Sequence, residues 1–215
     1  MKTSTIYLKS IKDKETNTIL KPGTNNKKLG NKVKSKKWKG KKMYSLTLVE
    51  RETCPESCHH WDDCYGNNMP FAHRFNTIGL EEKIESELDE LMEKHKEGIV
   101  IRLHVLGDFY STDYVRFWQE MLFKFPALCI FGYTARNDDI IGIGIDTLNF
   151  RFSERCRIRF SSNEVEDCIR VYAANEDFPP KRAHFTCPEQ TGKMKSCADC
   201  GLCWTTTKTV RFLNH

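Results

Sequence analysis

Hydrophobic positions follow a strand period and a helix period in turn along the middle of the chain. Residues 44–49 alternate between apolar and polar side chains, and residues 99–106 form a run rich in β-branched side chains, as strands do. Residues 80–96 and 114–125 instead place apolar side chains three and four positions apart, which is typical of amphipathic helices. The pattern therefore predicts strands that alternate with helices.

The same alternation continues toward the C-terminus. A strand at residues 128–133 is followed by a helix at residues 140–148, which contains two unfavourable glycines. Further strands are predicted at residues 157–161, 169–172, 183–185 and 209–213. This order indicates a parallel sheet with right-handed crossovers, in which functional residues gather at the C-terminal ends of the strands. Because a full barrel of eight such units takes about 250 residues, we expect an α/β fold with a partial TIM-like (βα) barrel.

Charge divides the chain into unlike parts. Residues 1–42 hold 14 lysines and two acidic residues, a balance of +12, whereas the remaining 173 residues have a balance of −7. Since this basic segment lacks a periodic apolar face, we expect it to be a flexible arm. Its stretch from Lys27 to Lys42 can either track a nucleic-acid backbone or act as a solvated leader. We assign the barrel to residues 43–182 and a cysteine-rich segment packed on it to residues 183–215.

Hydropathy and cysteine content indicate the cellular compartment in which the protein is expected to lie. The sequence has no apolar run of membrane-spanning length, and its N-terminus lacks a signal-peptide core. We therefore expect a cytoplasmic protein with no membrane partner. Thiols stay reduced in that compartment, so the ten cysteines favour metal binding over disulfides.

Four cysteines near the C-terminus have the most specific spacing in the sequence. Cys187, Cys197, Cys200 and Cys203 form the pattern C-x9-C-x2-C-x2-C. Two-residue gaps let successive thiolates turn toward a common centre, and thiolates favour iron–sulfur clusters or zinc over hard cations. The close spacing is more typical of [4Fe–4S] loops than of zinc ribbons, whose cysteine pairs stand apart. We predict a cluster here, with zinc, or free cysteines and disulfides, as the alternatives.

A second group of cysteines directly follows the first predicted strand. Cys54, Cys58 and Cys64 form the pattern C-x3-C-x5-C. Three thiolates can hold three corners of a second cluster and leave the fourth iron open, whereas His59 and His60 could instead complete a zinc site. Buried structural cysteines are the third alternative.

The position of this loop resembles the radical S-adenosylmethionine (radical SAM) enzymes, which carry C-x3-C-x2-C after the first strand of a parallel barrel. The resemblance implies a [4Fe–4S] cluster whose open iron binds SAM, with Tyr65 as the aromatic residue beside the last cysteine. It places the family's Gly-Gly-Glu-like segment, which contacts the SAM amino group, on Gly107 and Asp108. The chain departs from the family in two places. Five residues separate Cys58 from Cys64 where the family has two, and Asp108 stands where the family segment has a glutamate. The four C-terminal cysteines would correspond to an auxiliary cluster.

Longer segments resemble a bacteriophage family known as gene product 88. The resemblance covers most of the chain after residue 42 and implies a phage-encoded, cysteine-rich protein of the host cytoplasm, without supplying a reaction. The segments that carry it are Thr53–Cys58, Cys64–Arg74, Leu106–Ser111 and Cys197–Trp204.

Several basic residues have roles that depend on the direction of their side chains. Arg102 and His104 are expected to share one face of their strand, as are Arg157 and Arg159 of a later strand. If these faces line the barrel, they form a basic cavity for an anionic ligand, and if they face solvent they have no special role. Arg74, after the first cysteine loop, could neutralise cluster charge or lie on the surface.

Two functions follow from these patterns. The first is an iron–sulfur enzyme of the radical SAM type. The second is a non-catalytic iron–sulfur or zinc protein that binds nucleic acid through its basic N-terminal segment.

Overall fold

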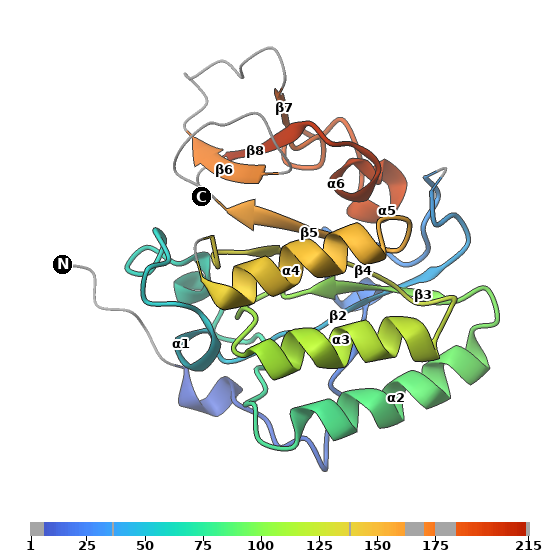
Figure 1. Cartoon of the computed structure of the whole chain (residues 1–215). Helices are drawn as coiled ribbons and strands as arrows, with labels where there is room; N and C mark the ends of the chain where they lie inside the picture. The colour runs from blue at the N-terminus through green and yellow to red at the C-terminus, as the bar shows by residue number, and fades with distance from the viewer. Residues whose placement is uncertain (1–6, 36, 138, 162–169, 175–183, 214–215) are drawn as a thin grey trace.

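The described strands form one open sheet. The structure, a computed structural model, describes residues 7–35, 37–137, 139–161, 170–174 and 184–213. Figure 1 shows the sheet running through the molecule in the order β1-β2-β3-β4-β5-β6-β8-β7. β1 pairs with β2 in antiparallel orientation, and each of the other described pairs is parallel. The strands are β1 (Lys21–Pro22), β2 (Lys42–Ser45), β3 (Ile99–Leu103), β4 (Cys129–Thr134), β5 (Cys156–Ser161), β6 (Arg170–Ala174), β7 (His184–Thr186) and β8 (Thr209–Leu213).

Three longer helices connect the strands from β2 to β5. The helix α3 begins after Ser111, whose Oγ accepts a hydrogen bond from the Tyr114 N–H at 3.0 Å. The helix α4 begins after Asp139, whose carboxylate accepts from the Gly142 N–H at 2.8 Å, so both helices have an N-cap. These helices are α2 (Leu80–Lys94), α3 (Thr112–Lys124) and α4 (Ile140–Arg151). The shorter helices are α1 (Glu50–Thr53), α5 (Cys197–Cys200) and α6 (Leu202–Thr205), with 3-10 turns η1 (Leu8–Ser10), η2 (Gly23–Asn25) and η3 (Tyr65–Asn68). Of the helices in the described residues, none is both long and apolar enough to cross a bilayer.

The predicted α/β class and parallel alternation are confirmed, but a TIM-like barrel is not shown. β1 and β7 are the edge strands, and no pairing among the described strands closes the sheet. Two strand boundaries also differ from prediction, because β2 ends at Ser45 and β3 ends at Leu103. Beyond β2 the backbone stays hydrogen-bonded, with the Leu48 N–H donating to the Leu106 carbonyl at 2.9 Å, but the regular ladder has ended.

The sheet is covered by helices on one face and by irregular segments on the other. Figure 1 shows α2, α3 and α4 side by side on the first face, where Leu88 and Trp118 are fully buried. The second face belongs to another hydrophobic cluster, which joins residues of the N-terminal and C-terminal segments to β4. Its larger members are Leu29, Val33, Trp38, Phe131 and Trp204.

The basic N-terminal segment is part of this second layer, so the prediction of a flexible arm is wrong for its described residues. Trp38 stacks on Trp204 with ring centroids 5.3 Å apart and planes 11° apart. The backbone N–H groups of Cys197 and Ala198 donate to the carbonyls of Lys28 and Leu29 at 2.7 and 2.9 Å. The few apolar residues of the segment have no period of their own, and the partners that bury them include Ala198 and Trp204, more than 150 positions away in the chain.

Replacing Trp38 by alanine is expected to lower the free energy of unfolding by about 3 kcal/mol, because the change removes a stacked, buried ring. Denaturant unfolding followed by far-UV circular dichroism measures this loss. Lys39→Ala, one position away and exposed, is the matched control and should change stability by less than about 0.5 kcal/mol. Equal unfolding midpoints for Trp38→Ala and the parent chain would contradict this packing.

Candidate metal centres

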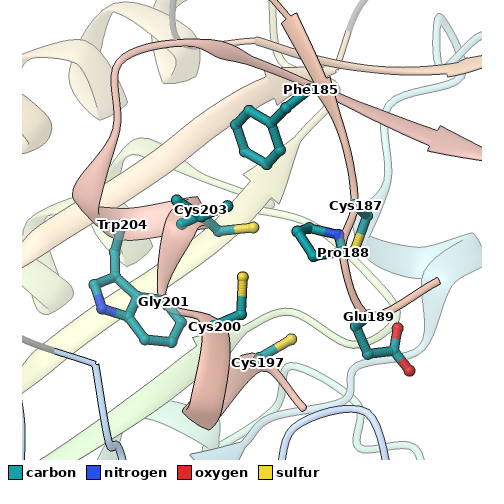
Figure 2. Close-up of a pocket in the computed structure, with 10 residues that line it drawn as sticks. Phe185, Cys187, Pro188, Glu189, Cys197, Cys200, Gly201, Cys203 and Trp204 are labelled. Atoms are coloured by element: carbon teal, nitrogen blue, oxygen red, sulfur yellow. The ribbon is translucent and has the colours of Figure 1, made fainter. Parts of the chain in front are cut away.

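Four cysteines from two segments line one pocket at the second face of the sheet. Cys187 directly follows β7, Cys197 and Cys200 lie in α5, and Cys203 lies in α6. Figure 2 shows their thiols pointing into a common space, with Cys187 facing the other three. The pocket holds about 290 Å³ of empty space, counting the part open to solvent. The structure thus brings together all four cysteines of the C-terminal pattern.

A left-handed glycine explains how the two-residue gaps present thiols in one direction. Gly201 has a φ of 70° and separates α5 from α6, so the chain makes two short helical turns with a sharp change of direction between them. A β-carbon at Gly201 would lie 2.3 Å from the Ser35 Oγ, so both the backbone angle and the space require glycine. At the start of α5, the Ser196 Oγ accepts from the Asp199 N–H at 3.2 Å and caps the turn.

Burial makes these thiols costly to ionise. Burial, followed by repulsion from Cys203, raises the pKa of Cys197 to about 12. Burial likewise raises the pKa of Cys200 and of Cys203. A bound metal would have to displace the protons of these thiols. Soft sulfur donors converge on this pocket, whereas the carboxylate of Glu189, which also lines it, lies 3.4 Å from the Lys28 Nζ. The donor set therefore fits a metal or cluster that prefers thiolates.

Basic and hydroxyl groups on the sheet support the α6 turn. Arg159 of β5 is fully buried, and its guanidinium donates to the carbonyls of Cys203 and Lys208 at 2.7 and 2.9 Å. The Tyr133 hydroxyl of β4 donates to the Cys203 Sγ at 3.2 Å. The sequence analysis named Arg159 as a candidate for an anion site but left the direction of its side chain open. It did not identify Tyr133. Alternation from the buried Phe131, two residues earlier in β4, would have placed Tyr133 on this same face.

The second cysteine group lies at the C-terminal end of β2. Cys54 follows α1, and Cys64 precedes η3, with Cys58 between them in the loop. Burial raises the pKa of Cys54, and Asp108, Cys58 and Cys64 add to this effect through their charges. The three thiols and the Asp108 carboxylate thus lie near enough for their charges to interact.

A buried ion pair stabilises the loop of this second group. The Arg74 guanidinium donates to both carboxylate oxygens of Glu50 in α1 at 2.9 Å. It also donates to the carbonyls of Gly66, Met69 and Ala72, which follow Cys64. Arg74 is 2% exposed and Glu50 is 4% exposed. Of the two roles open for Arg74, the surface position is excluded, and its described contacts are those of a support for the loop.

Gly107 and Asp108, the predicted SAM contacts, have clear structural roles. A β-carbon at Gly107, whose φ is 86°, would lie 2.7 Å from both the Leu48 Cβ and the Thr53 Oγ1. Burial raises the pKa of Asp108 to about 6, although its carboxylate accepts from the Thr134 hydroxyl and the Ala135 N–H, both at 2.7 Å. The pair thus joins the ends of β2, β3 and β4, and Asp108 remains electrostatically close to the thiols.

The expectation that Arg102 and His104 share one face is wrong. β3 ends at Leu103, and the His104 ring turns to the helix face, where its Nε2 lies 3.1 Å from the Tyr114 hydroxyl oxygen of α3. Arg102 lies on the opposite face, with its Cζ 5.5 Å from the centre of the Tyr133 ring. The face that carries Arg102 and Arg159 is therefore largely covered by protein: Arg159 is fully buried and Arg102 is half-buried.

The alternatives of zinc and nucleic acid gain no support from the described contacts. His60, a candidate zinc ligand, has its Nδ1 3.0 Å from the Asp63 Oδ1. Within the described residues, no three or more His, Cys, Asp or Glu side chains are grouped closely enough to hold a single metal ion. Binding at either cysteine group therefore needs local movement, as in sites whose formation is coupled to metal binding. Several lysines predicted to bind nucleic acid are paired within the molecule: Lys28–Glu189 (3.4 Å), Lys34–Asp199 (2.8 Å) and Lys37–Glu154 (3.4 Å).

Comparison with known proteins gives one result. A family model described as Gene product 88 matches residues 16–206, which include both cysteine groups and most of the basic N-terminal segment. No curated protein and no solved structure matches the chain significantly.

Proposed function

The chain belongs to the gene product 88 family of bacteriophages, and from the arrangement of its thiols we propose that it is an iron–sulfur enzyme of the radical SAM type. The observation that carries this proposal is the presence of two unlike thiol groups on one parallel sheet. One has four thiols that line a single pocket, and the other has three thiols in the loop region after β2, near Asp108.

The three-thiol group is the proposed reaction site. Three thiolates leave one position of a cubane cluster open, whereas four thiolates close it. A [4Fe–4S] cluster held by Cys54, Cys58 and Cys64 would have an open iron and would supply an electron to a SAM molecule bound there. The order of a cysteine loop after β2 and a glycine–acid pair after β3 supports this assignment. We propose that the open sheet corresponds to the partial barrel of that enzyme class.

The protein's own residues would prepare this site for a cluster. Burial raises the pKa of Cys58 and of Cys64, and the positive charge of Arg51 acts against that rise on both. Arg51 is itself held over the Trp61 ring, with its Cζ 4.5 Å from the ring centre. Arg136 donates to the carbonyl of Thr53 at 3.2 Å and so fixes the start of the loop. Asp108, which raises the pKa of Cys54, is the group that we assign to the SAM amino group.

The test is electron paramagnetic resonance of the reduced, anaerobic protein with and without SAM. SAM is expected to change the signal of one cluster only, because the four-thiol group has no open position. Dithionite with SAM should then release 5′-deoxyadenosine slowly. In Cys58→Ala, both the SAM-induced change and the 5′-deoxyadenosine should be lost, while the signal of the four-thiol cluster persists. Reconstituted wild-type protein that neither binds SAM in calorimetry nor forms 5′-deoxyadenosine would overturn the enzyme assignment.

A further inference from the structure

A tyrosine and an arginine lie on the sheet face between the two thiol groups. The Tyr133 hydroxyl of β4 donates a hydrogen bond to the Cys203 Sγ of the four-thiol group at 3.2 Å. The Arg102 guanidinium of the neighbouring strand β3 lies over the Tyr133 ring, with 5.5 Å between the Cζ and the ring centre. The pair thus lies beside the sulfur of Cys203.

Arg102 has no carboxylate partner among the described residues. Its Nε is buried and makes no hydrogen bond. A partly buried cation without an anion is costly, and thiolates on a metal would offset that cost because they carry net negative charge.

Arg159 has a different role, although it is also an arginine on this face of the sheet. Its three guanidinium nitrogens donate to the backbone carbonyls of Cys203, Thr206 and Lys208, so it fixes the course of the chain. Tyr133 instead donates to the sulfur itself, and Arg102 donates to no described group. Tyr133 and Arg102 can therefore stabilise negative charge on the thiols of the four-thiol group, and they do so without hydrogen bonds to the backbone of that group.

We propose that Tyr133 and Arg102 are tuning residues of the four-thiol centre, which stabilise its thiolates and raise its reduction potential. This inference rests on the proposed function, because it assumes a redox-active cluster. A reduced cluster carries one more negative charge than an oxidised one, so a hydrogen bond to sulfur and a nearby cation favour the reduced state.

The experiment is an anaerobic redox titration, followed by electron paramagnetic resonance, in a Cys58→Ala background in which only the four-thiol cluster remains. Tyr133→Phe removes only the hydroxyl, and Arg102→Met removes the charge at similar length. Both are expected to shift the midpoint potential to more negative values with unchanged iron content. Arg102→Lys keeps the positive charge, so its midpoint potential should stay close to that of the parent protein. A purely structural role of Arg102 would not predict this difference between Lys and Met. Unshifted potentials in both Tyr133→Phe and Arg102→Met would overturn the inference.

Matched controls exclude general effects of the substitutions. Tyr110→Phe removes a hydroxyl that bonds Glu81 on the helix side, and Arg116→Met removes an exposed charge that pairs with Asp113. Neither should move the potential.

A separate measurement shows whether the proposed function itself fails. If the Cys58→Ala protein contains zinc but no iron or sulfide, the four-thiol group does not hold an iron–sulfur cluster. The tuning role is then tested by the rate at which a chelator removes that zinc. Faster loss from Tyr133→Phe and Arg102→Met would support stabilisation of the thiolates, and equal rates would overturn it.

Discussion

Replacing Cys200 by alanine is expected to remove the cluster of the four-thiol pocket and to destabilise the second layer of the fold. Its thiol points into the centre of the pocket between those of Cys197 and Cys203 (Figure 2). Three remaining thiols give the site a different coordination, and because the pocket joins β7 to α5 and α6, metal binding there contributes directly to folding. Iron should fall by about four atoms per chain, and the thermal midpoint should fall with it.

Cys129→Ala is the matched control for this change. Cys129 is 1% exposed and belongs to the same hydrophobic cluster as Cys197. Its thiol is not among the residues that line the pocket. The control should therefore lose some stability from lost packing and no iron. Full iron content in Cys200→Ala, or equal loss in Cys129→Ala, would show that the pocket is not a metal centre.

Arg74→Met should strongly destabilise the fold. The substitution leaves the Glu50 carboxylate buried without its partner and frees three carbonyls of the loop after Cys64. Removing one member of a buried ion pair costs about 3–5 kcal/mol. Denaturant unfolding of the anaerobic protein should show this loss. The iron content of the three-thiol group should also decrease, because the loop loses its hydrogen bonds to Arg74. The cluster of the four-thiol group should remain.

A double variant tests whether the uncompensated charge is the cause. Arg74→Met combined with Glu50→Leu removes both charges, and it should recover a large part of the stability lost in Arg74→Met alone. Arg116→Met breaks an ion pair whose side chains are 65% and 79% exposed, and it should change stability by less than about 0.5 kcal/mol. No recovery in the double variant would mean that the bonds from Arg74 to the loop carbonyls dominate.

Periodicity was sufficient to predict the helical face of the sheet, but not the second layer. In α2, Leu80, Ile84 and Leu88 recur at helical spacing and are all fully buried, so the amphipathic pattern alone placed them in the core. Leu29 and Trp38 lie singly among lysines and have no such period. Their burial depends on Trp204 and on backbone bonds to residues 197 and 198, which no local pattern can reveal.

The candidate centres show the same limit. The spacing of Cys197, Cys200 and Cys203 is a local property, and it predicted the convergence of their thiols in α5 and α6. Tyr133 lies 70 positions from Cys203, and only the pairing of β4 with β5 brings that strand under α6. His104 was misplaced for the opposite reason, because strand alternation was extended one residue beyond the end of β3. Local spacing thus identified the donors, whereas the groups that surround them depend on the tertiary fold.

The most direct test of the central claim is the iron, acid-labile sulfide and zinc content of the full chain, purified without oxygen from cells supplied with iron. The account predicts a brown protein with iron and sulfide in about equal amounts, about eight of each per chain if both thiol groups hold a [4Fe–4S] cluster. One zinc per chain without sulfide, or no bound metal at all, would contradict it.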